Sequence, residues 1–322
     1  MKYEQQKTYS FQARRPQVLF LGNGLFYHDC SWDEFIDRCK RSDLDFNDWK
    51  DFKDSIPYSI RANIACDFDD KIRREKYSAQ LQSLKNDANI YVKENHFLKE
   101  LLSLPFDAVL TTNYTYQIEN CLDKTFVEKS NSQKNSKYAR CTQKDKDSKF
   151  LLHTFNQVNN HEIWHIHGEE RRKTSMVLTH DEYGRLSTEI GRYFRESADR
   201  YIAASEEFTV FTWMDYLLFA DVYVLGYGAD FAEFDFWWLL GRRMREKSPV
   251  GSIYFYEPLI VKSNVNNASK NFALAQSGVH VEHLGFVFND CYEDYASFYE
   301  AAIMDIKQKT ADPLLISSAV AS

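Results

Sequence analysis

Four short apolar runs of this sequence each end in a glycine-rich or polar turn. The turns are Gly22-Asn23-Gly24 after Val18–Leu21, Thr111-Thr112-Asn113 after Ala108–Leu110, His165-Ile166-His167-Gly168 at the end of a run from Ile163, and Gly226-Tyr227-Gly228 after Asp221–Leu225. In an open parallel sheet, ligands bind at the carboxyl ends of the strands. The recurrence therefore predicts one site at one edge of a sheet, although each motif alone is a weak signal.

The first turn, Gly22-Asn23-Gly24, has two interpretations. Glycines after a first strand let backbone N–H groups approach a pyrophosphate at a helix N-terminus. The same glycines also suit a tight turn with no ligand, and both interpretations stay open here. The third glycine of the dinucleotide fingerprint is missing, and no acidic residue closes an obvious second strand. These two gaps disfavour a hydride-transferring dehydrogenase.

Asn113 and His167 are the candidate catalytic residues. An asparagine amide both donates and accepts hydrogen bonds, so Asn113 is suited to hold a carboxamide or to orient a water. The alternative role for Asn113 is a helix N-cap. We expect His165 and His167 to face opposite sides, so that they do not chelate one metal together. The side chain of His165 then packs, and that of His167 faces a cleft as a general base.

Asp230 and Glu233 follow Gly228 and open a predicted helix. Their spacing also fits a capping box, which is the structural alternative to a role in binding ligand hydroxyls or phosphate.

Composition excludes several classes of function. The formal net charge of −7 disfavours nucleic acid as a partner. None of the six cysteines forms a C-x-x-C pair, which disfavours a structural zinc site and predicts that no metal is needed. No apolar run is long enough to span a membrane, and no apolar signal region precedes Val18. We expect a cytoplasmic protein with free thiols and no membrane contact.

The order of the elements predicts the fold class. Strands alternating with helices indicate an α/β fold, with a Rossmann-like parallel sheet and helices on both faces. We expect a polar N-terminal arm at 1–16, one domain at 17–310 and a C-terminal tail at 311–322. Within the domain, 43–103 is predicted to be an inserted helical subdomain and 123–149 a mobile loop. The stretch 182–219 is expected to be mostly helical.

The order and spacing of these motifs resemble the sirtuin-like domains of bacterial NAD hydrolases, found in anti-phage systems such as Thoeris-type and HerA-associated effectors. The matching stretches are Val18–Gly24, Ala108–Tyr114, Ile163–Gly168, Met176–Tyr183 and Asp221–Asp230. The resemblance implies that Asn113 and His167 are catalytic. It also implies that NAD is bound by Gly22, Asn23, Gly24, Thr112, Tyr114, Gly226, Gly228 and Asp230.

Two departures from related patterns bear on function. Thr115 stands where family members carry Asp, which bears on hydrogen bonding around the ribose. The paired C-x-x-C motifs of protein-deacylating sirtuins are absent.

The resemblance implies a NAD hydrolase that releases nicotinamide and ADP-ribose, acting as an abortive-infection effector. Such an effector must stay inactive until triggered, so we expect a homo-oligomer or a HerA-type or other ATPase partner that gates the site. Two alternatives remain. One is a NAD-dependent protein deacylase or ADP-ribosyltransferase on the same fold. The other is a non-catalytic NAD or nucleotide sensor that signals by assembly.

Overall fold

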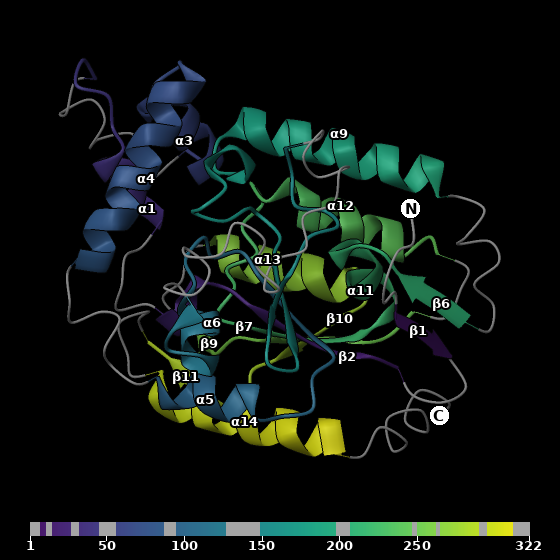
Figure 1. Cartoon of the computed structure of the whole chain (residues 1–322). Helices are drawn as coiled ribbons and strands as arrows, with labels where there is room; N and C mark the ends of the chain where they lie inside the picture. Colours follow the sequence, from purple (N-terminus) through teal and green to yellow (C-terminus); the bar gives the residue numbers. More distant parts are fainter. Residues whose placement is uncertain are drawn as a thin grey trace.

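A computed structural model gives the architecture of the chain (Figure 1). It describes residues 7–10, 15–26, 32–44, 56–86, 95–126, 149–197, 207–246, 250–261, 265–289 and 295–311. Most of the predicted mobile loop at 123–149, most of the predicted arm at 1–16 and nearly all of the tail at 311–322 lie outside the described residues.

The central sheet is mostly parallel. Among the described residues it contains β2 (Gln17–Leu21), β3 (Ala108–Thr111), β4 (Asn156–Val158), β5 (His161–His165), β7 (Asp221–Leu225), β8 (Ile253–Tyr256) and β10 (Val279–Glu282). The spatial order is β10-β8-β7-β2-β3-β5-β4, and only the edge strand β4 runs antiparallel to its neighbour. The chain builds outward from β2 to β3 and β5, then returns to β7 on the other side of β2. This is a doubly wound sheet, with its topological switch point between β2 and β7.

Helices cover both faces of the sheet, as the sequence predicts for this fold class (Figure 1). The first face carries α1 (Trp32–Arg38), α3 (Tyr58–Ala65), α4 (Asp70–Asn86), α9 (His180–Glu196), α11 (Trp213–Phe219), α12 (Phe234–Arg243) and α13 (Val265–Gln276). The second face carries α5 (His96–Leu102), α6 (Gln117–Leu122) and α14 (Ala296–Ala311). Side chains along a strand alternate between the faces. In β2, Val18 and Phe20 join the first core while Leu19 and Leu21 join the second.

The predicted insertion at 43–103 does not behave as one subdomain. Helices α1, α3 and α4 lie together at one end of the first face, where α3 contacts both α1 and α9 (Figure 1). Helix α5, from the same stretch, packs on the opposite face against α6 and α14. Leu98, Leu101 and Leu102 give α5 the apolar stripe that fixes it there. The chain therefore crosses from one face to the other within the predicted insertion.

Small sheets add strands that the sequence interpretation missed. β1 (Lys7–Ser10) pairs antiparallel with β6 (Glu207–Val210), so part of the predicted polar arm is a strand. Helices α9 and α11 make most of 182–219 helical, as predicted, and β6 is a strand within that stretch. Elsewhere β9 (Leu259–Ile260) pairs with β11 (Val287–Phe288). The short 3-10 helices η1 (Asn23–Phe26) and η3 (Lys173–Ser175) complete the assignment. No helix among the described residues is long and apolar enough to cross a membrane.

Candidate functional site

The glycine turns after β2 and β7 meet at the switch point. The Gly22 N–H donates to the Leu225 carbonyl at 3.1 Å, and the Gly24 N–H donates to the Gly226 carbonyl at 2.7 Å. A Cβ on Gly22 would lie 2.4 Å from the Gly226 carbonyl oxygen, and Gly226 itself has a φ of +67°. Only glycine tolerates this approach and this backbone.

The contacts of this turn bear on the two interpretations of Gly22-Asn23-Gly24. The N–H groups of Gly22 and Gly24 are bonded to protein carbonyls, so the tight turn is observed and neither donor is left for a pyrophosphate. Asn23 opens the short helix η1 beside them.

Asp230 and Gly228 lie at the exposed surface in the turn before α12. The Asp230 carboxylate accepts from the Ala232 N–H at 2.7 Å, and the Asp230 N–H donates to Glu233 at 3.2 Å. The helix begins at Phe234 with Glu233 as its N-cap residue, so Asp230 does not cap it as a capping box requires. Asp230 shapes this turn, and its predicted contact with NAD stays a prediction.

Asn113 is buried at the carboxyl end of β3, with 6% of its surface exposed. Helix α6 begins only at Gln117, with Tyr116 at the N-cap position, so the alternative of a helix cap at Asn113 is wrong. Neither the oxygen nor the nitrogen of the Asn113 amide has a hydrogen-bond partner among the described residues. Buried polar atoms are almost always paired, so this amide calls for a ligand or water.

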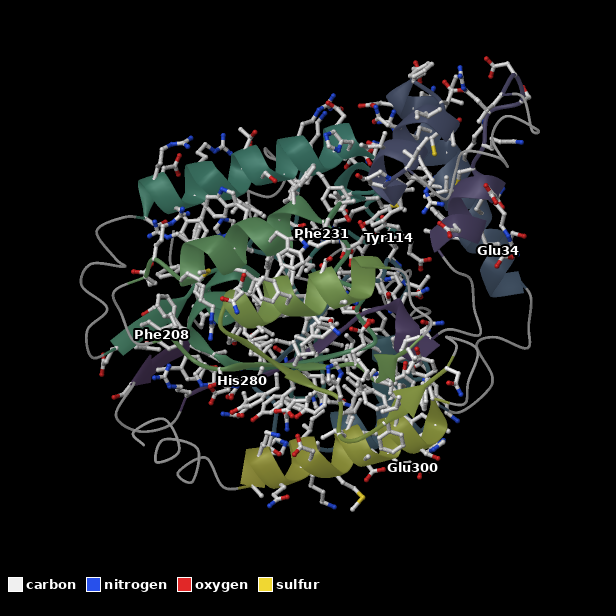
Figure 2. All side chains as sticks on the ribbon, turned by 180° about the vertical axis from the view of Figure 1, so that it is seen from behind. Glu34, Tyr114, Phe208, Phe231, His280 and Glu300 are labelled. Carbon is white, nitrogen blue, oxygen red and sulfur yellow. The ribbon has the colours of Figure 1, made fainter. Side chains whose placement is uncertain are left out.

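The residues around Asn113 fix the turn between β3 and α6. The Thr111 hydroxyl donates to the Leu21 carbonyl at 2.9 Å, which ties the end of β3 to the end of β2. Thr112 is buried beside it, and Thr115 is half-buried in the same turn. The Tyr114 hydroxyl donates to the Val177 carbonyl at 2.5 Å, in the interior on the first face (Figure 2). Tyr114 therefore helps to build the site, and its predicted contact with NAD stays untested.

His167 leaves the sheet plane through a glycine turn. Strand β5 ends at His165, and the Gly168 N–H donates back to the His165 carbonyl at 3.0 Å. Gly168 has a φ of +91°, and a Cβ there would lie 2.3 Å from the Ser175 carbonyl oxygen. His165 and His167 do face opposite sides of the sheet, since their partners lie in α6 and α12 respectively. The cause is this turn, because residues two apart in a continuous strand share a face.

The imidazole of His167 is buried and contacts the polar groups of two side chains. Its Nε2 lies 2.9 Å from Asp235 Oδ2, and its Nδ1 lies 3.4 Å from the Tyr183 hydroxyl. The Tyr183 hydroxyl in turn lies 2.5 Å from that of Tyr58. Burial lowers the pKa of His167, but the Asp235 carboxylate more than offsets this, so that the pKa is raised above its ordinary 6.5.

A second carboxyl, that of Glu233, lies buried near the same imidazole. Burial raises the pKa of Glu233 to about 7, and the nearby charge of His167 only partly opposes this. His167 and Glu233 are therefore two buried side chains with shifted pKa values, and they lie near each other beside the Asp235 carboxylate. Perturbed titratable side chains of this kind gather at functional sites.

Sequence reasoning missed three residues around His167. Asp235 stands two residues after Glu233 in the first turn of α12, and only the fold shows that it faces the end of β5. Tyr183 ends one of the matching stretches but was not named as a site residue, and it is fully buried in α9. Tyr58 comes from α3, in the predicted insertion, and no local signal connects it with His167.

Comparison with known families agrees with this arrangement. Residues 107–212 match the family model described as a SIR2-like domain. The match supports a sirtuin-like assignment for this part of the chain. Such domains bind and use NAD, so the assignment indicates NAD-dependent activity in general. No curated protein matches the sequence.

The SIR2-like match has informative limits. It contains Asn113, Tyr114 and His167, but it begins after Gly24 and ends before Gly226. The match therefore includes the β3–α6 turn and the β5 turn, but neither of the glycine turns after β2 and β7. Among the residues the structure describes, no group of three or more His, Cys, Asp or Glu side chains is placed to hold a metal ion.

Proposed function

We propose that this protein hydrolyses NAD, cleaving the bond between nicotinamide and the ribose. The observation that carries the proposal is the unpartnered, buried amide of Asn113 at the same sheet edge as the His167–Asp235 pair. The SIR2-like match supports NAD as the substrate. An amide with free donors and an acceptor fits the ribose hydroxyls and the carboxamide of NAD.

The reaction needs little from the protein. The glycosidic bond breaks with its electron pair moving to the nicotinamide ring nitrogen, which leaves a cationic ribose carbon. Water then bonds to that carbon and loses a proton, giving ADP-ribose, nicotinamide and one proton. We assign Asn113 to orienting the ribose or this water. The buried site limits access of other water to the reactive carbon.

We assign Nδ1 of His167 as the base from the hydrogen bonds of its ring. A carboxylate can only accept, so the neutral imidazole facing Asp235 carries its hydrogen on Nε2. Nδ1 is then the basic atom, and its 3.4 Å contact with Tyr183 is long enough for a substrate hydroxyl to replace it. Because the pKa of His167 is raised, the rate should increase with pH through a value above 6.5.

The direct test is to incubate the purified protein with NAD and separate the products by chromatography. Equal amounts of nicotinamide and ADP-ribose are expected, and His167→Ala and Asn113→Ala should lower the rate by at least about 100-fold. His180→Gln is the matched control, because this exposed histidine at the start of α9 packs only its ring against Phe234. Intact NAD with every candidate activator present would exclude hydrolysis. Nicotinamide release only with an acylated peptide would instead identify a deacylase.

A second variant tests the role of Asp235. Asp235→Asn can donate to Nε2, which moves the imidazole hydrogen to Nδ1 and removes the base. We expect a loss of about 100-fold or more in kcat with little change in NAD binding. A rate equal to that of the parent would show that Asp235 does not set the tautomer.

We further propose that turnover is gated, as the resemblance to anti-phage effectors implies, by self-assembly or by an ATPase partner of the HerA type. The test measures native mass and NAD turnover together, with and without the partner. Gating predicts turnover only in the assembled sample. Equal turnover in the isolated monomer would overturn it.

A further inference from the structure

His165 is a second fully buried histidine, on the other face of the sheet from His167. Its Nδ1 lies 2.6 Å from the backbone carbonyl oxygen of Asn113, and its Nε2 lies 2.8 Å from Glu119 Oε1. Glu119 is in the first turn of α6 and is also completely buried. The function proposed above does not use this pair.

Counting hydrogens fixes the protonation of the pair. The Asn113 carbonyl can only accept, so Nδ1 of His165 must carry a hydrogen. Glu119 Oε1 also accepts from the Asn156 amide at 2.8 Å, so the contact with Nε2 needs a further shared hydrogen. The His165–Glu119 pair therefore holds one proton more than a neutral imidazole facing a carboxylate. Burial lowers the pKa of His165, but Glu119 outweighs it and the pKa stands at about 9.

The hydrogen bond from His165 is part of a clamp on the backbone of Asn113, the residue whose side-chain amide is unpartnered. The Asn113 N–H donates to the Thr111 hydroxyl at 3.1 Å, and the Asn113 carbonyl accepts from His165. Both peptide groups that flank the Cα of Asn113 are thus held. Since the Asn113 side chain has no protein partner of its own, its direction depends on this backbone.

We propose that His165 is the positioning residue for Asn113, a buried imidazolium that holds the Asn113 carbonyl from behind the sheet and is itself anchored by Glu119. The proposal rests on the proposed function for its effect on turnover. A clamp of this kind sets where the amide meets substrate, and a displacement of about 1 Å at such a group can change a rate about 100-fold.

The test compares two variants of the same pair. In Glu119→Gln, the glutamine NH2 donates to Nε2 of a neutral His165, so the bond to Asn113 survives, while Asn156 loses this acceptor and keeps its bond to Glu169. In His165→Phe, no donor reaches the Asn113 carbonyl. We expect Glu119→Gln to keep kcat for NAD within about 3-fold of the parent, and His165→Phe to lower kcat about 10- to 100-fold. Equal losses in both variants, or a folded His165→Phe as active as the parent, would overturn the proposal.

A spectroscopic measurement separates this proposal from the proposed function. In protein carrying ¹⁵N-labelled Asn, the side-chain signal of Asn113 is identified by its loss in Asn113→Asp. That signal should move in His165→Phe and stay in Glu119→Gln, whether or not NAD is hydrolysed. Labelled histidine should show hydrogens on both ring nitrogens of His165 at pH 7. A neutral ring there would overturn the assignment of an imidazolium. An Nδ1 without a hydrogen, or an Asn113 signal indifferent to His165, would overturn the clamp even in a protein that hydrolyses NAD.

Discussion

Glu233 is a buried carboxyl whose ionisation the fold opposes, so replacing it should change how stability depends on pH. The substitution Glu233→Gln keeps the shape of the side chain and an acceptor for the Asp230 N–H, which lies 3.2 Å away. It removes the charge near His167. Only the titration of position 233 and its coupling to neighbouring charges should therefore differ between variant and parent.

The magnitude follows from the two pKa values of Glu233. Its pKa rises from the ordinary 4.5 to about 7 in the folded protein, and each pKa unit corresponds to about 1.4 kcal/mol. Below pH 4.5 both states are protonated, and this stabilising contribution is fully present. As the pH rises, the unfolded chain ionises first, and the contribution is lost completely above pH 7. The parent should lose about 3 kcal/mol of unfolding free energy that the variant keeps.

The assay is urea unfolding of both proteins at pH 5 and pH 8, followed by circular dichroism. When the pH is raised from 5 to 8, the parent should lose about 2 to 3 kcal/mol more of its free energy of unfolding than Glu233→Gln does. Glu34→Gln, at an exposed position of α1, is the control and should show no such gain (Figure 2). A difference between Glu233→Gln and parent that is the same at both pH values would refute the reasoning.

Two further predictions concern stability alone. Gly226→Ala should lower the free energy of unfolding by at least about 2 kcal/mol, because the residue has positive φ and its Cβ would lie 2.5 Å from the Leu25 nitrogen. Gly241→Ala is the control, because no atom lies within 4 Å of its Cβ; its free energy of urea unfolding should be unchanged or slightly higher. Arg243→Met should lower the Tm, because the buried guanidinium donates at 2.7 Å to two carbonyls at the end of α11. Its exposed neighbour provides the control Arg245→Met, and equal Tm changes in the two would contradict this role.

The sheet could be predicted from the sequence because its strands are buried on both faces. Asp221–Leu225 was predicted with the bounds that the structure shows. Continuous apolar runs that end in glycine or proline are local signals, so they can be recognised from the sequence without tertiary information. Strand β6 was missed because its four residues form a weakly alternating edge whose partner, β1, lies about 200 positions earlier in the chain.

The candidate site could be predicted only in part. Four strand-end motifs predicted that these residues meet at one edge of the sheet, because parallel strands place their carboxyl ends together. The sequence could not show that Gly22 and Gly24 direct their N–H groups at protein carbonyls. Nor could it pair His167 with Asp235, since that contact joins β5 to α12 across 68 positions.

Asn113 shows how a departure from local packing rules marks a candidate site. A buried amide without partners costs about 1 to 3 kcal/mol of stability, and Thr111 and His165 hold its backbone in place by two further hydrogen bonds. An arrangement that served only folding would turn such an amide toward a partner or replace it with an apolar side chain. The fold instead holds the amide rigid and unpartnered, which is the condition for binding a ligand without reorganisation. The same reasoning separates the two histidines, since His165 has both ring nitrogens in short hydrogen bonds whereas His167 keeps one nitrogen in only a long contact.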